Sequence, residues 1–92
     1  MKFMIYCLDK PGAASLRAAN RAAHLDYLKN FAGQVVVAGP LLADDDAGMI
    51  GSLLLMEFPD RAAADSFAKG DPYRKAGLFE TVAITPWRQT LP

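Results

Sequence analysis

The chain has 92 residues, of which 52% are hydrophobic, and its ten basic side chains balance ten acidic ones. This length predicts a single domain over residues 1–92, and a balanced charge without a lysine or arginine cluster argues against nucleic-acid binding. No apolar run reaches the roughly 18 residues that a membrane-spanning helix needs, so we expect no membrane partner.

The first predicted element is a strand over Lys2–Leu8, which is followed by turn residues. Its apolar run lacks the small-residue cleavage pattern of a secretory signal, and the single cysteine, Cys7, cannot form an internal disulfide. We therefore expect a cytoplasmic protein. Cys7 alternates with apolar neighbours, which favours a small buried side chain over a nucleophilic thiolate paired with the only histidine.

The second element is an amphipathic helix over Leu16–Phe31, with Ser15 as its N-cap and Gly33 as a left-handed stop. At about 100° per residue, one stripe of this helix gathers Leu16, Arg17, Asn20, His24, Tyr27, Leu28 and Phe31. Three polar residues interrupt the stripe, and one of them is the only histidine. Such an interruption is typical of a functional site, although a core histidine bonded to a backbone carbonyl fits the same pattern.

Two strands follow, over Gln34–Gly39 and Met49–Phe58, and each, like the first strand, is apolar on both faces. Pro40 either ends the first of them or places it at a sheet edge, because proline has no N–H to donate. The loop between them carries three adjacent acids, Asp44–Asp46. They lack the alternate spacing and the glycine of a calcium loop, so we expect a solvated loop tip.

The remainder predicts a helix from the N-cap Asp60 to Gly70, a short helical turn over Asp71–Ala76, and a strand over Leu78–Trp87 that carries Pro86 near its end. The βαββαβ order predicts an α+β, ferredoxin-like fold with a four-stranded antiparallel sheet and both helices on one face. Because the strands are apolar on both faces, the second face needs a cover. A second copy of the chain supplies it, giving a homodimer that packs sheet against sheet.

In this fold the helix that carries His24 and the segment after the second helix lie on the same face of the sheet. Asp71 can therefore come within about 3.2 Å of the imidazole and fix its tautomer, as a general base or acid requires. The alternative is that Asp71 only caps the backbone amide of Tyr73 or Arg74. One histidine and one cysteine cannot supply the usual zinc ligands, and no phosphate-binding glycine motif occurs, so we expect neither a metal nor a cofactor.

Several short motifs, in their order and spacing, resemble the YciI-like family of the dimeric α/β-barrel superfamily. They are Arg17, Arg21 and His24 in the helix, Ala38–Leu41, Gly51, Asp71–Tyr73 and Gly77. The resemblance covers nearly the whole chain and implies a ferredoxin-like fold, dimerisation through the sheets, and a site centred on a histidine and an aspartate, here His24 and Asp71. Some members of that family eliminate HCl from chlorinated hydroxyquinols.

We therefore expect a small cleft between the first helix, the strand end at Gly39 and Pro40, and the turn at Asp71–Tyr73. The favoured function is cofactor-independent acid–base chemistry of the lyase (dehydrochlorinase) or isomerase type on a small aromatic or carbonyl compound. His24 moves the proton and Asp71 orients it. Substrate contacts fall to Arg17 or Arg21 for an anion, and to Tyr73, which either donates a hydrogen bond or only packs. The alternatives are a non-catalytic module that binds a small molecule or a partner, and a cofactor-free monooxygenase.

Overall fold

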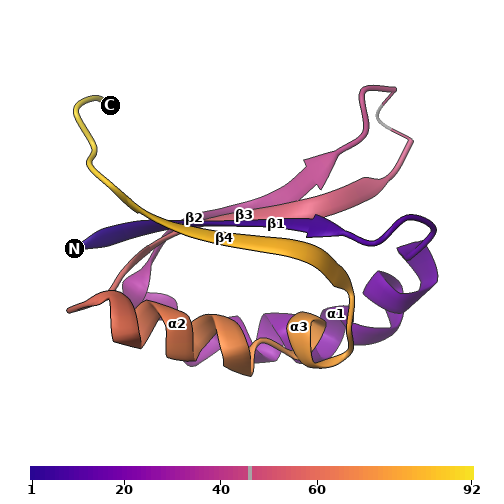
Figure 1. Ribbon diagram of the computed structural model, residues 1–92, viewed down its shortest axis with the longest axis horizontal. Coiled ribbons are helices and arrows are strands. Elements are labelled where there is room, and N and C mark those ends of the chain that lie inside the picture. The colour runs from indigo at the N-terminus through magenta and orange to yellow at the C-terminus, as the bar shows by residue number, and fades with distance from the viewer. Residues whose placement is uncertain (46) are drawn as a thin grey trace.

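The computed structural model of the chain describes residues 1–45 and 47–92 (Figure 1). In chain order its elements are β1 (Lys2–Asp9), α1 (Ala14–Lys29), the 3-10 turn η1 (Ala32–Gln34), β2 (Val35–Leu42), β3 (Met49–Glu57), α2 (Arg61–Gly70), the short α3 (Pro72–Lys75) and β4 (Phe79–Trp87). The predicted βαββαβ order is confirmed, and the predicted short helical turn after the second helix is α3.

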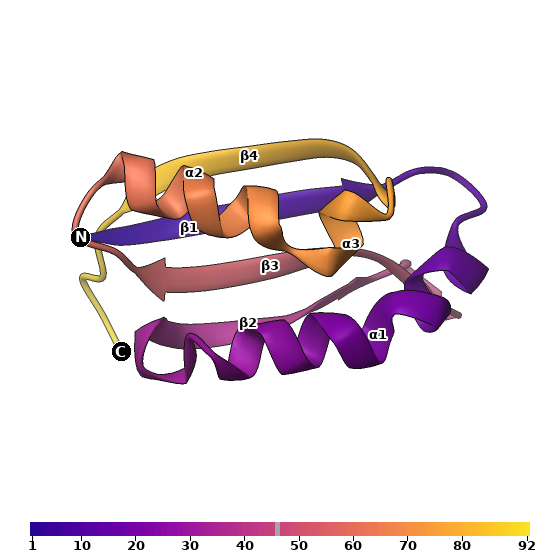
Figure 2. The same ribbon diagram turned by 90° about the horizontal axis from the view of Figure 1, so that it is seen from below.

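The four strands form one antiparallel sheet in the order β2-β3-β1-β4. All helices lie on one side of this sheet, with α1 running beside β2 and α2 beneath β1 (Figures 1 and 2). The α+β, ferredoxin-like prediction is therefore confirmed. Both edge strands carry a proline, Pro40 in β2 and Pro86 in β4, as predicted for strands that need not offer every N–H to a neighbour.

The hydrophobic core lies between the sheet and the helices. In β1, alternate residues Phe3, Ile5 and Cys7 face the helices and are at most 2% exposed. The core is completed by Leu54 and Met56 of β3, by Phe58 directly after β3, and by Ala64 and Phe67 of α2. A period of two in the strands has thus placed one apolar set under the helices.

The opposite face of the sheet, which we call the open face, is also apolar. It presents Met4, Tyr6 and Leu8 of β1 and, opposite them in register, Leu55, Leu53 and Gly51 of β3. Val37 of β2 lies across from Leu55 on the same face and is 56% exposed. None of the helices lies on this side of the sheet (Figure 1).

The predicted ends of the first helix were wrong at both termini. Ala13 occupies the N-cap position and no side chain caps the helix, so Ser15 lies inside the first turn. The helix ends at Lys29, and Gly33 lies in the 3-10 turn without a positive φ. The last turn tightens into i to i−3 hydrogen bonds, such as that from the Phe31 amide to the Leu28 carbonyl, and this exit needs no left-handed residue.

The second strand also differs from the prediction, because it continues through Pro40 to Leu42. At an edge strand the missing N–H of proline does not interrupt the pairing with β3. In the loop beyond it, Asp44 and Asp45 are exposed and the Asp45 carboxylate accepts the Ala47 amide at 3.0 Å. Asp46, the third acid of the predicted loop tip, lies outside the described residues.

Among the residues that the structure describes, no helix combines the length and the hydropathy that crossing a membrane requires.

Candidate active site

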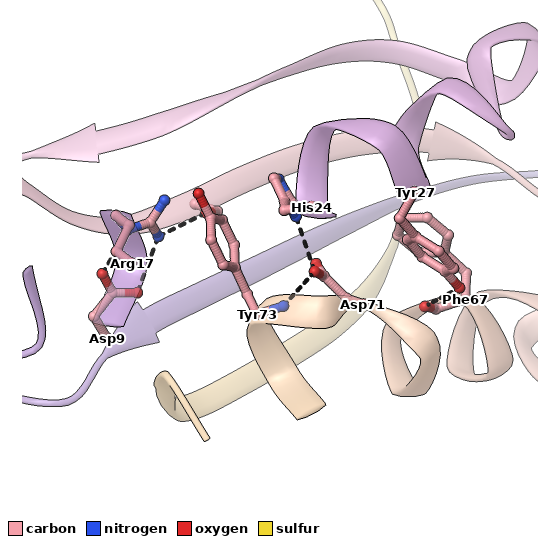
Figure 3. A network of polar contacts seen from close by, with 8 residues as sticks. Asp9, Arg17, His24, Tyr27, Phe67, Asp71 and Tyr73 are labelled. Carbon is pink, nitrogen blue, oxygen red and sulfur yellow. Dashed lines mark hydrogen bonds and ion pairs between the residues drawn. The ribbon is translucent and has the colours of Figure 1, made fainter. Parts of the chain in front are cut away.

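A cavity of about 250 Å³ opens between α1, the β2–β3 part of the sheet and α3. Its walls combine basic and aromatic side chains with apolar ones: Arg17, Arg21, His24, Leu25, Leu28, Ala38, Gly39, Pro40, Met49, Ser52, Leu54 and Tyr73. Six of the seven residues that the sequence singles out line this cavity. The seventh, Asp71, is not part of the cavity wall but contacts His24 (Figure 3).

His24 and Asp71 are in direct contact. Nδ1 of the imidazole lies 2.8 Å from Oδ1 of the carboxylate, and both side chains are less than 10% exposed. The same Oδ1 accepts the backbone amide of Tyr73 at 2.9 Å, so Asp71 also caps α3. Asp71 therefore both contacts the imidazole and caps a backbone amide, the two roles that the sequence left open. The cap holds the carboxylate against the imidazole.

This contact sets the chemistry of the imidazole. When Nδ1–H donates to a carboxylate, the neutral ring carries its lone pair on Nε2. His24 lines the cavity, so the free nitrogen is available to a molecule bound there. The arrangement has the geometry of a general base whose tautomer is fixed by its partner.

Tyr73 lies between two side chains of α1, as Figure 3 shows. Its ring stacks on His24 with 4.0 Å between centroids and 16° between planes. The Arg17 guanidinium lies over the ring, 4.6 Å from its centroid. Burial raises the pKa of the Tyr73 phenol, more than the nearby Arg17 charge lowers it, so the hydroxyl stays protonated at neutral pH and can donate a hydrogen bond.

Arg17 is buried and not in solvent. Its Nε and Nη2 donate to the two carboxylate oxygens of Asp9 at 2.7 and 3.0 Å, and Nη2 also donates to Ser52 Oγ at 2.9 Å. Burial lowers the pKa of Arg17, but the Asp9 hydrogen bond and charge outweigh it and the net shift is upward. The guanidinium is permanently charged, and its charge is compensated by Asp9.

Arg21, one turn further along α1, contrasts with Arg17. It lines the cavity, is exposed, and forms no ion pair with any described residue. On the opposite wall Gly39 and Pro40 present the edge strand β2. Of the two arginines predicted to hold an anion, Arg21 is the one with an uncommitted guanidinium.

Sequence reasoning missed Asp9 and Ser52. In the sequence Asp9 is the kind of residue found in a turn after the first strand. In the structure β1 continues to Asp9 across a register shift, and the Asp9 carboxylate accepts a hydrogen bond from Arg17. Ser52 is the one hydroxyl on the otherwise apolar inner face of β3, and that break in the pattern is the signal that could have identified it.

Cys7 lies in the core beneath the site. Burial, followed by the charge of Asp71, raises the pKa of its thiol to about 12. At neutral pH the thiol therefore carries its proton and is no nucleophile, in agreement with the prediction of a small buried side chain. Among the described residues, no three histidine, cysteine or carboxylate side chains gather closely enough to hold a metal ion.

Comparison with known proteins identifies the family. The family described as the YCII-related domain matches residues 1–88. This chain belongs to the YCII family. Protein YciI of Escherichia coli O6:H1 is 35% identical over 97% of this chain and 98% of its own. An uncharacterised protein of Haemophilus influenzae is 33% identical to this chain over the same shares.

Solved structures resemble this YCII chain at two levels. A 5-chloro-2-hydroxyhydroquinone dehydrochlorinase, TftG, from Burkholderia phenoliruptrix AC1100, solved in complex with 2,5-dihydroxybenzoquinone, has 40% identity and a TM-score of 0.89 over 96% of this chain and 94% of its own. An antibiotic biosynthesis monooxygenase has 16% identity and a TM-score of 0.54 over 96% and 98%. The second likeness establishes the fold alone.

Proposed function

We propose that the chain is a cofactor-independent lyase that eliminates HCl from a chlorinated, hydroxylated aromatic compound. The observation that carries this proposal is the buried 2.8 Å contact between His24 Nδ1 and Asp71, which leaves the second imidazole nitrogen for the cavity. The similarity to a dehydrochlorinase over nearly the whole chain supports the same reaction class.

The reaction needs a base and no external oxidant. His24 Nε2 takes a proton from the substrate, and Asp71 stabilises the imidazolium that forms. One hydroxyl proton of the substrate first moves to the ring carbon that carries chlorine, which gives the keto tautomer. The O–H electron pair left by the second hydroxyl proton, the one that His24 takes, then forms a new C=O bond, the adjacent ring double bond shifts, and the C–Cl electron pair leaves with chloride. The products are an unsaturated quinone-type ring, one proton and one chloride ion, so atoms and electrons balance without a redox partner.

The walls of the cavity suit a flat, electron-rich ring. Leu25, Leu28 and Leu54 offer apolar surface on which a ring can pack. Tyr73 can donate a hydrogen bond to a substrate oxygen, and Arg21 can pair with a phenolate. Arg17, whose charge Asp9 already compensates, holds Tyr73 in place and does not bind the anion itself.

We further propose that the working unit is a homodimer in which two open faces pack against each other. Between the charged pair Lys2 and Glu57 at one end and Leu8 and Gly51 at the other, the open face of β1 and β3 is apolar, whereas an antiparallel sheet that meets water normally carries polar side chains on that face. A two-fold axis places the same patch of each copy against the other, which covers both at once. A reducing cytoplasm is the compartment that we propose, since the one cysteine is a buried free thiol.

The test is an anaerobic assay of purified protein with 5-chloro-2-hydroxyhydroquinone, following chloride release. We expect turnover without added cofactor, and a loss of about 10³-fold or more in kcat for His24→Gln and for Asp71→Asn. Asn20→Ala is the matched control, because Asn20 lies one turn before His24 on α1 and its side-chain amide donates to the Leu16 carbonyl and not to His24 or Asp71. Circular dichroism checks that each variant folds.

Three other results would contradict the proposal, each in its own way. Turnover that requires oxygen would indicate a cofactor-free monooxygenase. Binding of the substrate without chloride release would indicate a non-catalytic binding module. Undiminished turnover in a folded Asp71→Asn variant would remove the carboxylate from the mechanism.

A further inference from the structure

A second contact joins α1 to α2 beside the His24–Asp71 pair. Tyr27 follows His24 by three residues on α1, and Gly70, the last residue of α2, directly precedes Asp71. The two ends of this contact are thus tied by short stretches of backbone to the two ends of the candidate acid–base pair. Figure 3 shows Tyr27 reaching α2 on the far side of Asp71 from Tyr73.

The Tyr27 hydroxyl binds the end of α2. It donates to the Phe67 carbonyl oxygen at 2.9 Å. Phe67 is in the last turn of α2, where carbonyls lack their usual helical partners, and the Asp71 amide that would serve it donates instead to the Ala68 carbonyl at 3.3 Å. Tyr27 therefore supplies a side-chain donor to a carbonyl in the last turn of α2.

Gly70 provides the space for this contact. A Cβ atom at position 70 would collide with the Tyr27 hydroxyl oxygen and lie 3.0 Å from Tyr27 Cζ. Gly70 has no positive φ, so space and not backbone conformation accounts for the glycine. The ring cannot easily turn aside, because it packs against Phe31 and Phe67 with centroids at 5.1 and 5.4 Å.

We propose that Tyr27 and Gly70 are positioning residues, and that their contact holds the Asp71 carboxylate at hydrogen-bond distance from His24. We call it the Tyr27–Gly70 clamp. Its kinetic consequence rests on the proposed lyase function, whereas its effect on the imidazole does not. Burial, followed by the charge of Asp71, raises the pKa of the Tyr27 phenol, which keeps the hydroxyl protonated as the donor that the clamp requires.

The test compares Tyr27→Phe and Gly70→Ala with Gly33→Ala, the matched control. A Cβ at Gly33 would meet no atom within 4 Å, and Gly33 lies outside the site. The primary measurement is the ¹⁵N chemical shift of the two His24 ring nitrogens at about pH 8.5, which reports the nitrogen that carries the proton in a neutral imidazole. A role in stability alone would leave this tautomer ratio unchanged.

We expect the Nδ1–H form to predominate in the wild type and in Gly33→Ala, and to lose its predominance in both clamp variants. Chloride release should show kcat falling about tenfold in Tyr27→Phe and about 100-fold in Gly70→Ala, with KM changed less than about twofold, because orientation and not binding is lost. An unchanged tautomer ratio in both clamp variants, or an equal change in Gly33→Ala, overturns the proposal. If the wild type releases no chloride, the lyase proposal fails and the tautomer ratio still decides the clamp.

The double variant Tyr27→Phe/Gly70→Ala tests whether the two residues act as one unit. Removing the hydroxyl oxygen removes the principal collision with a Cβ at position 70. The double variant should therefore be no worse than Gly70→Ala alone, whereas fully additive losses would mean that the positions act independently and would contradict the clamp.

Discussion

The two faces of the sheet are both rich in apolar side chains, but the helices cover only one of them. The face under the helices combines a core around Met56 and Phe67 with a polar cluster that includes Arg17, His24 and Asp71. The open face has apolar residues such as Leu55 and no helix over it. Buried ion pairs add little net stability, and apolar surface in water adds none. The folding of a single chain therefore explains neither the buried polar cluster nor the uncovered apolar face. The polar cluster points to chemistry, and the open face to assembly.

The sharpest test of this difference uses two consecutive residues of β3 that point to opposite faces. Met56→Glu places a charge in the core, where Met56 is fully buried, and should cost about 5 kcal/mol or more, enough to unfold a domain of this size. Leu55→Glu places the same charge on the open face and should leave a folded monomer of 9.9 kDa. Circular dichroism and sedimentation velocity measure the two outcomes. A Leu55→Glu chain that still sediments as a dimer would contradict the proposed interface.

The two arginines of α1 allow a comparison between a buried, ion-paired residue, Arg17, and an exposed residue at the cavity, Arg21. Arg17→Gln leaves the Asp9 carboxylate buried without its partner and should lower the free energy of unfolding by about 3 kcal/mol. Arg21→Gln should change stability by less than about 0.5 kcal/mol and raise KM for a phenolate substrate about tenfold. Urea unfolding and substrate saturation measure these two effects. Equal stability losses would show that burial does not distinguish the two residues.

The smallest expected effect concerns Cys7, an apolar neighbour beneath the cluster. Burial raises the pKa of its thiol from 9.0 in the unfolded chain to about 12 in the folded one. Above pH 9 the unfolded state therefore loses a proton that the folded state keeps, and stability falls as pH rises, by about 1.4 kcal/mol per pH unit up to pH 12. Cys7→Ala should abolish this component, cost about 1 kcal/mol at pH 7 and leave turnover within about twofold. Urea unfolding at pH 8 and pH 10 measures the slope in both proteins, and lost turnover in a folded Cys7→Ala would revive the thiolate.

The sequence alone predicts the fold because its signals are periodic and local. Alternation in β1 and β3 groups Phe3 with Ile5 and Leu54 with Met56, but because both strand faces are apolar only the structure shows that these sets lie under the helices. Asp60 caps α2 through its side chain, as its position in the sequence indicates. The end of α1 was mispredicted, since several local exits are compatible with Gly33 and only packing chooses the 3-10 turn.

The candidate site is predictable where one residue type is unique and unpredictable where partners are distant. His24 is the only histidine, and the fold brings Asp71 to the same side of the sheet. Arg17 instead binds Asp9 across a turn and Ser52 from another strand, a contact set that no spacing encodes. For a long side chain with several possible partners, only the packed structure shows which partner it binds.

The prolines at both sheet edges have a consequence for how large an assembly can grow. Pro40 in β2 and Pro86 in β4 offer no N–H to a strand that approaches from outside, which discourages the edge-to-edge addition that leads to fibres. The proposed pairing through the open face, in contrast, covers the apolar sheet face that the helices leave bare in the described part of each copy. Strand addition at the sheet edges is hindered, and association through the open face stops once two copies have covered each other. The expected product is therefore a particle of fixed size and not a polymer.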